Sequence, residues 1–164
     1  RPIKHSSIQP KEDDRMNPKR MFFGFVGGFL ATLIFHQSAL AVLWQAGLAP
    51  FAPFSLAPTA PLGVPAVVSL AFWGGVWGVV FAWIDTHFPP GDGYWVTAFL
   101  FGALAPSLVA LLVVLPLKGH PVGGGWRPSL LVTAFLVNGA WGLGTGLILR
   151  ALSRRFGGAR GSLA

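Results

Sequence analysis

No charged residue occurs in the long stretch from Met21 to Ile84, and two more uncharged runs cover residues 93–117 and 128–149. A helix needs about 20 mostly apolar residues to cross the hydrocarbon core of a bilayer. The first run is long enough to cross it twice, and each of the other two can cross it once. Charged residues make up only 10% of the chain, against about 25% in a typical soluble domain. The pattern therefore predicts an all-α membrane protein with four transmembrane helices.

Prolines, glycines and charges set the limits of the four spans. We expect them at about residues 21–46, 66–84, 94–117 and 128–152, which together form one transmembrane domain over residues 21–152. Span four begins at Pro128, and proline is favoured at a first helical position. Pro106 in span three removes a backbone hydrogen bond and should kink that helix. A basic and polar tail (1–20) precedes the domain, and a basic tail (153–164) follows it.

Two of the connecting loops carry their own sequence signals. Five prolines between residues 47 and 65 exclude a regular helix there, and apolar residues lie between them. We expect an extended, proline-stiffened loop at the level of the lipid headgroups, with a re-entrant loop or proline-rich docking of a partner as alternatives. The second loop, D-T-H-F-P-P-G-D-G, brings together Asp85 and His87, which we interpret as part of a solvated turn.

The basic residues are unevenly divided between the two sides of the predicted bundle. Four spans place both termini on one side, and that side holds ten of the twelve Lys and Arg residues. The two others, Lys118 and Arg127, lie in the loop between spans three and four. By the positive-inside rule both termini are cytoplasmic, in a multi-pass protein of the bacterial inner (plasma) membrane. The net charge of +7 does not indicate nucleic-acid binding, because no basic face carries interleaved aromatic residues.

The first fifteen residues are polar and include three acidic residues, Glu12, Asp13 and Asp14. Met16 opens M-N-P-K-R-M-F-F, which reads as a natural start, so we expect residues 1–15 to be a disordered tail or an upstream extension. The first apolar run is longer than the roughly 7–15 residues of a signal-peptide core. We therefore expect this run to remain in the protein as an anchor.

Small residues recur at intervals of four in every span, and residues four apart form one ridge of a helix. Small side chains allow helix backbones to approach closely, so we predict that these rows are ordinary packing surfaces that need no ligand. Spans two and four also share G-x-W-G, at residues 75–78 and 139–142, a pattern that two duplicated helical hairpins in parallel orientation would produce. The glycines of the rows are Gly24, Gly28, Gly74, Gly78, Gly102, Gly142 and Gly146.

A polar trio, His36, Gln37 and Ser38, interrupts span one, and Asn138 lies at similar depth in span four. We expect His36 and Asn138 to face other helices, with a structural hydrogen bond between them. A functional site is the alternative that any polar residue inside a membrane raises. Contact with a quinone or a carotenoid would need only one hydrogen-bond donor and an apolar groove, so it stays open.

Other chemistry inside the spans lacks essential parts. The chain has no cysteine, which excludes disulfides, thiolate catalysis and Cys-ligated metal. A bis-histidine haem needs a second histidine in the spans, and the spans contain none. A proton pathway usually includes an acidic residue inside the membrane, and the spans contain none of these either. One histidine alone cannot form a zinc site. We therefore predict no catalytic residue, no metal site and no bound cofactor.

Four short segments give the chain a family likeness: H-Q-S-A-L in span one, A-P-L-G-V-P before span two, A-F-W-G-G-V-W-G within it and L-P-L-K-G after span three. With them, residues 16–155 resemble a group of small uncharacterised four-helix inner-membrane proteins of proteobacteria. The resemblance implies no enzymatic or transport activity and transfers no functional residues. We expect a non-enzymatic, accessory or assembly role, with a small oligomeric transporter or channel as the alternative. The expected partners are the lipid bilayer and either a larger membrane complex or further copies of the chain.

Overall fold

The computed structural model describes residues 17–157, and it is helical apart from two short strands and the connecting loops. Four helical stretches are long and apolar enough to cross a membrane, as the sequence predicted: Pro18–Gln45, Ala66–His87, Asp92–Leu117 and Pro128–Phe156. The predicted tails at residues 1–16 and 158–164 lie outside the described residues. Within the described part, the protein is therefore a four-helix chain with the character of an integral membrane protein.

The first span consists of α1 (Pro18–Ala31), a π-helical turn η2 (Thr32–His36) and α2 (Gln37–Gln45). It begins three residues before the predicted start because Asn17 and Pro18 form a helix start signal. The side chain of Asn17 accepts a hydrogen bond from the Lys19 amide at 3.0 Å, and Pro18 occupies a position where an amide N–H would have no helical partner. The wide turn η2 contains His36, so the polar trio begins at a local change of helix geometry.

The remaining spans follow the predicted order. The bounds of α3 coincide with the prediction for span two, whereas the last helix continues past residue 152. That helix has 30 residues and is about 45 Å long, which exceeds the roughly 30 Å of the hydrocarbon core. Its last turns, which carry the terminal arginines, therefore extend beyond the apolar layer. The elements are α3 (Ala66–Ile84), η3 (Asp85–His87), α4 (Asp92–Val109), η4 (Ala110–Val114), α5 (Leu115–Leu117), η5 (Val122–Trp126) and α6 (Pro128–Gly157).

The helix of span three does not end at Pro106. The backbone N–H of Ala110 donates to the carbonyl groups of both Pro106 and Ser107, and the π-helical turn η4 begins there. Pro106 has no N–H to donate, which frees the carbonyl group of Gly102 one turn upstream, whereas η4 begins four residues downstream at Ala110. The irregularity that follows Pro106 is thus a widened turn within a continuous span.

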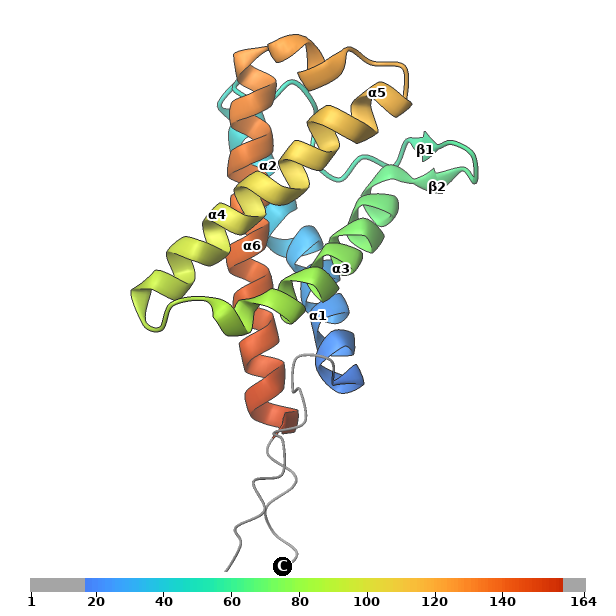
Figure 1. Cartoon of the computed structure of the whole chain (residues 1–164). Helices are drawn as coiled ribbons and strands as arrows, with labels where there is room; N and C mark the ends of the chain where they lie inside the picture. The colour runs from blue at the N-terminus through green and yellow to red at the C-terminus, as the bar shows by residue number, and fades with distance from the viewer. Residues whose placement is uncertain (1–16, 158–164) are drawn as a thin grey trace, which may run out of the picture.

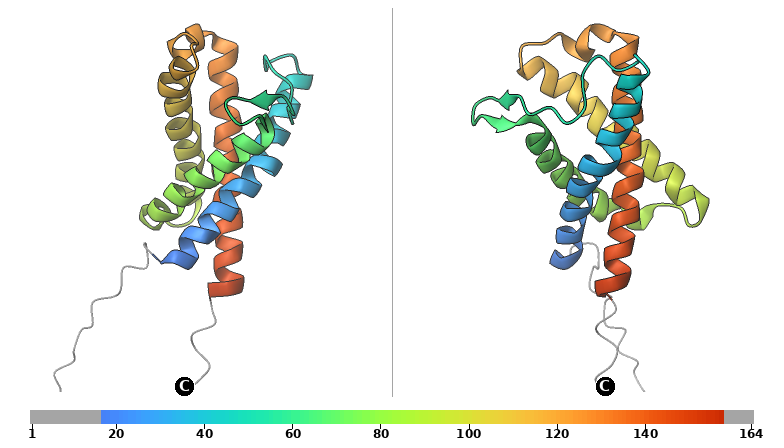
Figure 2. Two further views of the ribbon diagram at one scale, coloured as in Figure 1. Left: turned by 90° about the vertical axis from the view of Figure 1, so that its right-hand side faces the viewer. Right: turned by 180° about the vertical axis from the view of Figure 1, so that it is seen from behind.

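The helices pack as two pairs, and the long helix α6 of the second pair also contacts the first pair. In one pair α1 lies on α3, in the other α4 lies on α6, and α1 also lies along α6. Figure 1 shows α6 upright through the centre, and the left view of Figure 2 shows α1 and α3 side by side, crossing α6 at an angle. The start of α1 and the end of α6 meet at one end of the molecule, where the Lys19 ammonium donates to the carbonyl group of Phe156.

Glycine faces bring the two helices of each pair into backbone contact. A methyl carbon added at Gly28 of α1 would lie 2.2 Å from the carbonyl oxygen of Gly74 in α3, and one at Gly78 would lie 2.2 Å from that of Gly24. In the second pair, a methyl carbon at Gly102 of α4 would lie 2.3 Å from the carbonyl oxygen of Asn138 in α6. Real side chains do not approach backbone atoms this closely, so only glycine fits these positions.

The two pairs use the same contacts at corresponding positions of the G-x-W-G repeat. The Phe25 ring of α1 covers Gly75 of α3, and the Phe99 ring of α4 covers Gly139 of α6. This agreement supports the interpretation that the chain consists of two duplicated hairpins. Gly146 behaves differently from the other glycines of the rows, because it faces the rings of Tyr94 and Phe81.

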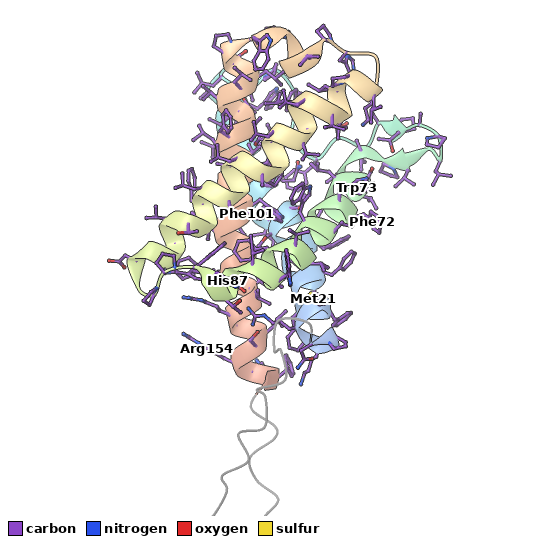
Figure 3. The ribbon with its side chains drawn as sticks, in the orientation of Figure 1. Met21, Phe72, Trp73, His87, Phe101 and Arg154 are labelled. Atoms are coloured by element: carbon purple, nitrogen blue, oxygen red, sulfur yellow. The ribbon has the colours of Figure 1, made fainter. Side chains whose placement is uncertain are left out.

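Aromatic rings fill the space between the two pairs. The ring of Phe81 lies edge-on to those of Phe88, Phe101 and Trp141, with centroids 5.5, 5.7 and 6.3 Å away. Such edge-to-face contacts are favourable for the ring quadrupoles. The indole N–H of Trp141 donates to the carbonyl oxygen of Gly28 at 3.0 Å, which joins α6 to the α1–α3 contact. The core thus combines these rings with small and aliphatic residues such as Ala31, Ala98 and Leu149, and Figure 3 shows Phe101 close to the middle of the bundle.

The proline-rich segment 47–65 contains a small hairpin that the sequence did not predict. Strands β1 (Pro58–Thr59) and β2 (Val64–Pro65) pair antiparallel, and the hairpin projects to one side of the bundle in Figure 1. Its pairing includes two prolines, which have no N–H to donate, so propensity argued against a strand. The Thr59 hydroxyl donates instead to the Val64 carbonyl oxygen at 2.8 Å. Leu62 at its tip is 83% exposed, and an apolar loop of this kind suits the headgroup region of a membrane.

Candidate functional site

The structure divides the predicted polar trio. His36 and Gln37 are buried, whereas Ser38 is exposed on the outer surface of the helix. The side-chain nitrogen of Gln37 lies 3.4 Å from Nδ1 of His36, and its oxygen accepts a hydrogen bond from the backbone N–H of Phe54 at 2.6 Å. Gln37 therefore fastens the proline-rich loop to the first span. His36 lies beside Gln37, and both side chains are buried within the chain.

The predicted hydrogen bond between His36 and Asn138 is wrong. Asn138 donates to the Ser107 hydroxyl at 2.9 Å, and that hydroxyl donates to the carbonyl oxygen of Ala134 at 3.1 Å. The physical reason is the direction of the glycine ridge. Asn138 lies on the same ridge as Gly142, and this ridge faces α4 rather than the first span. Asn138 thus connects spans three and four.

A charged cluster that the sequence did not predict lies at the end of the bundle where α1 begins and α6 ends. Asp85, which we expected in a solvated turn, is only 7% exposed, so that interpretation is wrong. The guanidinium of Arg20 binds one oxygen of this carboxylate and donates from Nε to the Ala82 carbonyl oxygen at 3.0 Å. The Tyr94 hydroxyl donates to the other carboxylate oxygen at 3.1 Å. Asp85 therefore has partners from the first and the third span.

The fourth span joins the cluster through a cation–π contact. The guanidinium carbon of Arg150 lies 3.3 Å from the centre of the Tyr94 ring and 5.3 Å from that of Trp95. A guanidinium stacked on an aromatic face is held there by the ring quadrupole. The cluster thus joins all four spans, which contribute Arg20, Asp85, Tyr94 and Arg150 in turn. One sequence signal could have pointed to the cluster: Arg20 precedes span one and Asp85 follows span two, and the two ends of a helical hairpin lie side by side.

An open hollow of about 510 Å³ adjoins this cluster. Its lining comes from α6, from η3 and the turn that leads into α4, and from one residue each of α1 and α4. Figure 3 shows His87 and Arg154 at this end of the molecule. Both residues are exposed, and among the described residues no three His, Cys, Asp or Glu side chains gather as a metal site. The polar residues that line the hollow are Arg20, Asp85, Thr86, Tyr94, Arg150, Ser153 and Arg154.

The chemistry of the site is that of an anion-binding surface. Three guanidinium groups line the hollow together with a single carboxylate, and that carboxylate already binds Arg20 and Tyr94. Guanidinium groups present several N–H donors in a plane and suit carboxylate or phosphate oxygens. No protein-family model, no curated protein and no solved structure matches this chain.

Proposed function

We propose that this chain is a non-enzymatic, accessory protein of the bacterial inner membrane, with both termini in the cytoplasm. Four apolar helices are compatible with an integral membrane protein. The orientation is supported by the basic residues, ten of which belong to the side of the two termini and two to the opposite loop. The choice of a bacterial membrane rests on the sequence resemblance to proteobacterial inner-membrane proteins.

The observation that carries the accessory role is the use of the polar groups in the spans. Gln37 holds the loop at Phe54, Asn138 binds Ser107, and Trp141 binds the first span, all within this chain. Hydrogen bonds between membrane helices contribute roughly 0.6–2 kcal/mol each, enough to explain these residues as structural. These three polar side chains are thus used to hold the bundle together.

The outer surface of the bundle supports the same role. Phe72 and Trp73 of α3 are half exposed, and the Phe72 ring lies edge-on to the Phe25 ring of α1, with centroids 6.0 Å apart. Aromatic side chains on the outside of a membrane helix can pack against a neighbouring helix as well as against lipid. The chain therefore has a core filled by aromatic rings and exposed aromatic side chains on its outer surface. This combination suits a subunit that packs beside another membrane protein.

The test is the composition of the complex in the native membrane. A tagged chain produced at its natural level would be extracted with surrounding lipid into polymer discs and weighed by native mass spectrometry. We expect one second membrane protein at fixed stoichiometry, absent when an equally tagged, unrelated four-span protein is used. A species made only of this chain, together with solute flux through it in proteoliposomes, would contradict the accessory role.

The alternative is a small oligomeric transporter or channel. Within one copy, glycine contacts close the α1–α3 and α4–α6 interfaces, and the rings of Phe81, Phe101 and Trp141 fill the space between them. A solute pathway would then have to run between copies of the chain. Oligomers of uniform size that conduct an ion or solute would support this alternative.

A further inference from the structure

The hollow beside the charged cluster has an excess of positive charge. Arg20 is neutralised by Asp85, the one ion pair among the described residues. Arg150 and Arg154, one helical turn apart on α6, also line the hollow, and neither has a carboxylate partner in the described part of the chain. Two guanidinium groups therefore face the hollow without a neutralising charge, next to the hydroxyl of Ser153.

The donors of Arg150 are held in position before any ligand arrives. Its guanidinium rests on the rings of Tyr94 and Trp95, and Tyr94 is fixed by its hydrogen bond to Asp85. A cation–π contact uses the face of a guanidinium and leaves N–H groups at its edge for other acceptors. A fixed fork of donors binds a tetrahedral oxyanion better than a free side chain, since less side-chain entropy is lost.

A bilayer around the four spans would present its phosphate groups near the hollow. The hollow is at the end of the bundle, just beyond the uncharged runs of the four spans, and its lining also includes the apolar residues Phe88, Pro89, Pro90 and Leu149. Basic pockets between transmembrane helices bind the headgroups of anionic lipids, and the apolar lining would contact the glycerol and upper acyl chains. Free inorganic phosphate offers the same oxyanion without an apolar portion.

From this geometry we propose that the hollow binds a phosphate group, with Arg150 and Arg154 as its donors, and that an anionic phospholipid supplies it. Arg20, Asp85 and Tyr94 are positioning residues, because they hold the wall of the hollow and the guanidinium of Arg150. The site does not depend on the accessory role proposed above, because a phosphate-binding hollow would serve a transporter as well.

The chain provides a matched pair of variants for the test. Arg154 lines the hollow, whereas its neighbour Arg155 does not and instead lies over the Phe156 ring, 5.8 Å from its centre. Arg154→Gln and Arg155→Gln remove the same charge from adjacent, exposed positions, so both should fold. The full chain in detergent would be titrated with phosphatidylglycerol and with phosphatidylcholine, and bound lipid would be counted by native mass spectrometry.

We expect one phosphatidylglycerol molecule to bind in preference to phosphatidylcholine, and Arg154→Gln to weaken its affinity about tenfold, with little change in Arg155→Gln. Arg150→Lys, which keeps the charge but loses the planar fork, should also weaken it. Inorganic phosphate that displaces the lipid with the same dependence on Arg154 would support the phosphate site with a free ion as ligand. Equal losses in Arg154→Gln and Arg155→Gln, or equal binding of the two lipids, would overturn the proposal.

Discussion

Gly27 and Gly28 of α1 are adjacent, buried and helical, but a methyl group would clash with a neighbouring backbone only at Gly28. A methyl carbon at Gly28 would lie 2.2 Å from the Gly74 carbonyl oxygen, whereas one at Gly27 would lie 3.5 Å from the nearest atom, the Thr145 carbonyl oxygen. The second distance is an ordinary van der Waals contact. We predict that Gly28→Ala destabilises the protein and that Gly27→Ala does not.

The magnitude follows from the clash. To accept a methyl group at Gly28, α1 and α3 must separate locally by about 1 Å, and overpacking of this size costs about 1–3 kcal/mol. Both variants gain the same helix propensity, about 1 kcal/mol in favour of alanine over glycine. That gain cancels in the comparison, so Gly28→Ala should be less stable than Gly27→Ala by about 1–3 kcal/mol.

The assay is unfolding in mixed micelles with a rising fraction of sodium dodecyl sulfate, followed by tryptophan fluorescence. The free energy of unfolding of each variant is compared with that of the unchanged chain. Gly102→Ala, at the corresponding position of the second pair and 2.3 Å from the Asn138 carbonyl oxygen, should repeat the loss. Equal stability of the Gly27→Ala and Gly28→Ala variants would refute the argument that the glycine rows set the distance between the helices.

Three further predictions use the same unfolding measurement. Gln37→Leu leaves the backbone N–H of Phe54 without its acceptor and should lower the free energy of unfolding by about 1–3 kcal/mol. The loop should also be cleaved faster by a protease, and unchanged cleavage would show that other contacts hold it. Asn138→Leu should cost about 0.6–2 kcal/mol, and the loss should shrink in a Ser107→Ala background, whereas additive losses would argue against their hydrogen bond. Asp85→Asn should destabilise by about 1–3 kcal/mol and the exposed Asp92→Asn by much less; similar effects would place Asp85 at the surface.

The spans could be predicted from the sequence because hydrocarbon imposes a length and a composition on each helix. The end of the proline-rich segment and the first charge after the apolar run, Asp85, predicted both ends of α3 correctly. At the chain ends the signal was weaker, since the arginines of α6 mark the edge of the apolar layer and not the end of the helix.

The charged cluster and the small hairpin could not be predicted in the same way. Arg20 and Asp85 are distant in sequence and meet only because α1 and α3 pack as an antiparallel pair. A charge next to a loop is usually solvated, and only tertiary structure shows that Asp85 is buried. The partner of Asn138 was missed for a related reason: periodicity identifies a ridge of a helix but does not say which neighbour it faces.

A bundle that crosses the membrane four times, with both ends in the cytoplasm, underlies the proposed role and the proposed lipid site. Alkaline phosphatase, which is active only outside the cytoplasm, would be inserted after Gly63, Gly91 or Gly124 or attached after Ala164. We predict activity at Gly63 and Gly124 and none at Gly91 and Ala164. The reverse pattern would contradict the orientation, and equal activity at Gly91 and Gly124 would contradict the crossing of span three.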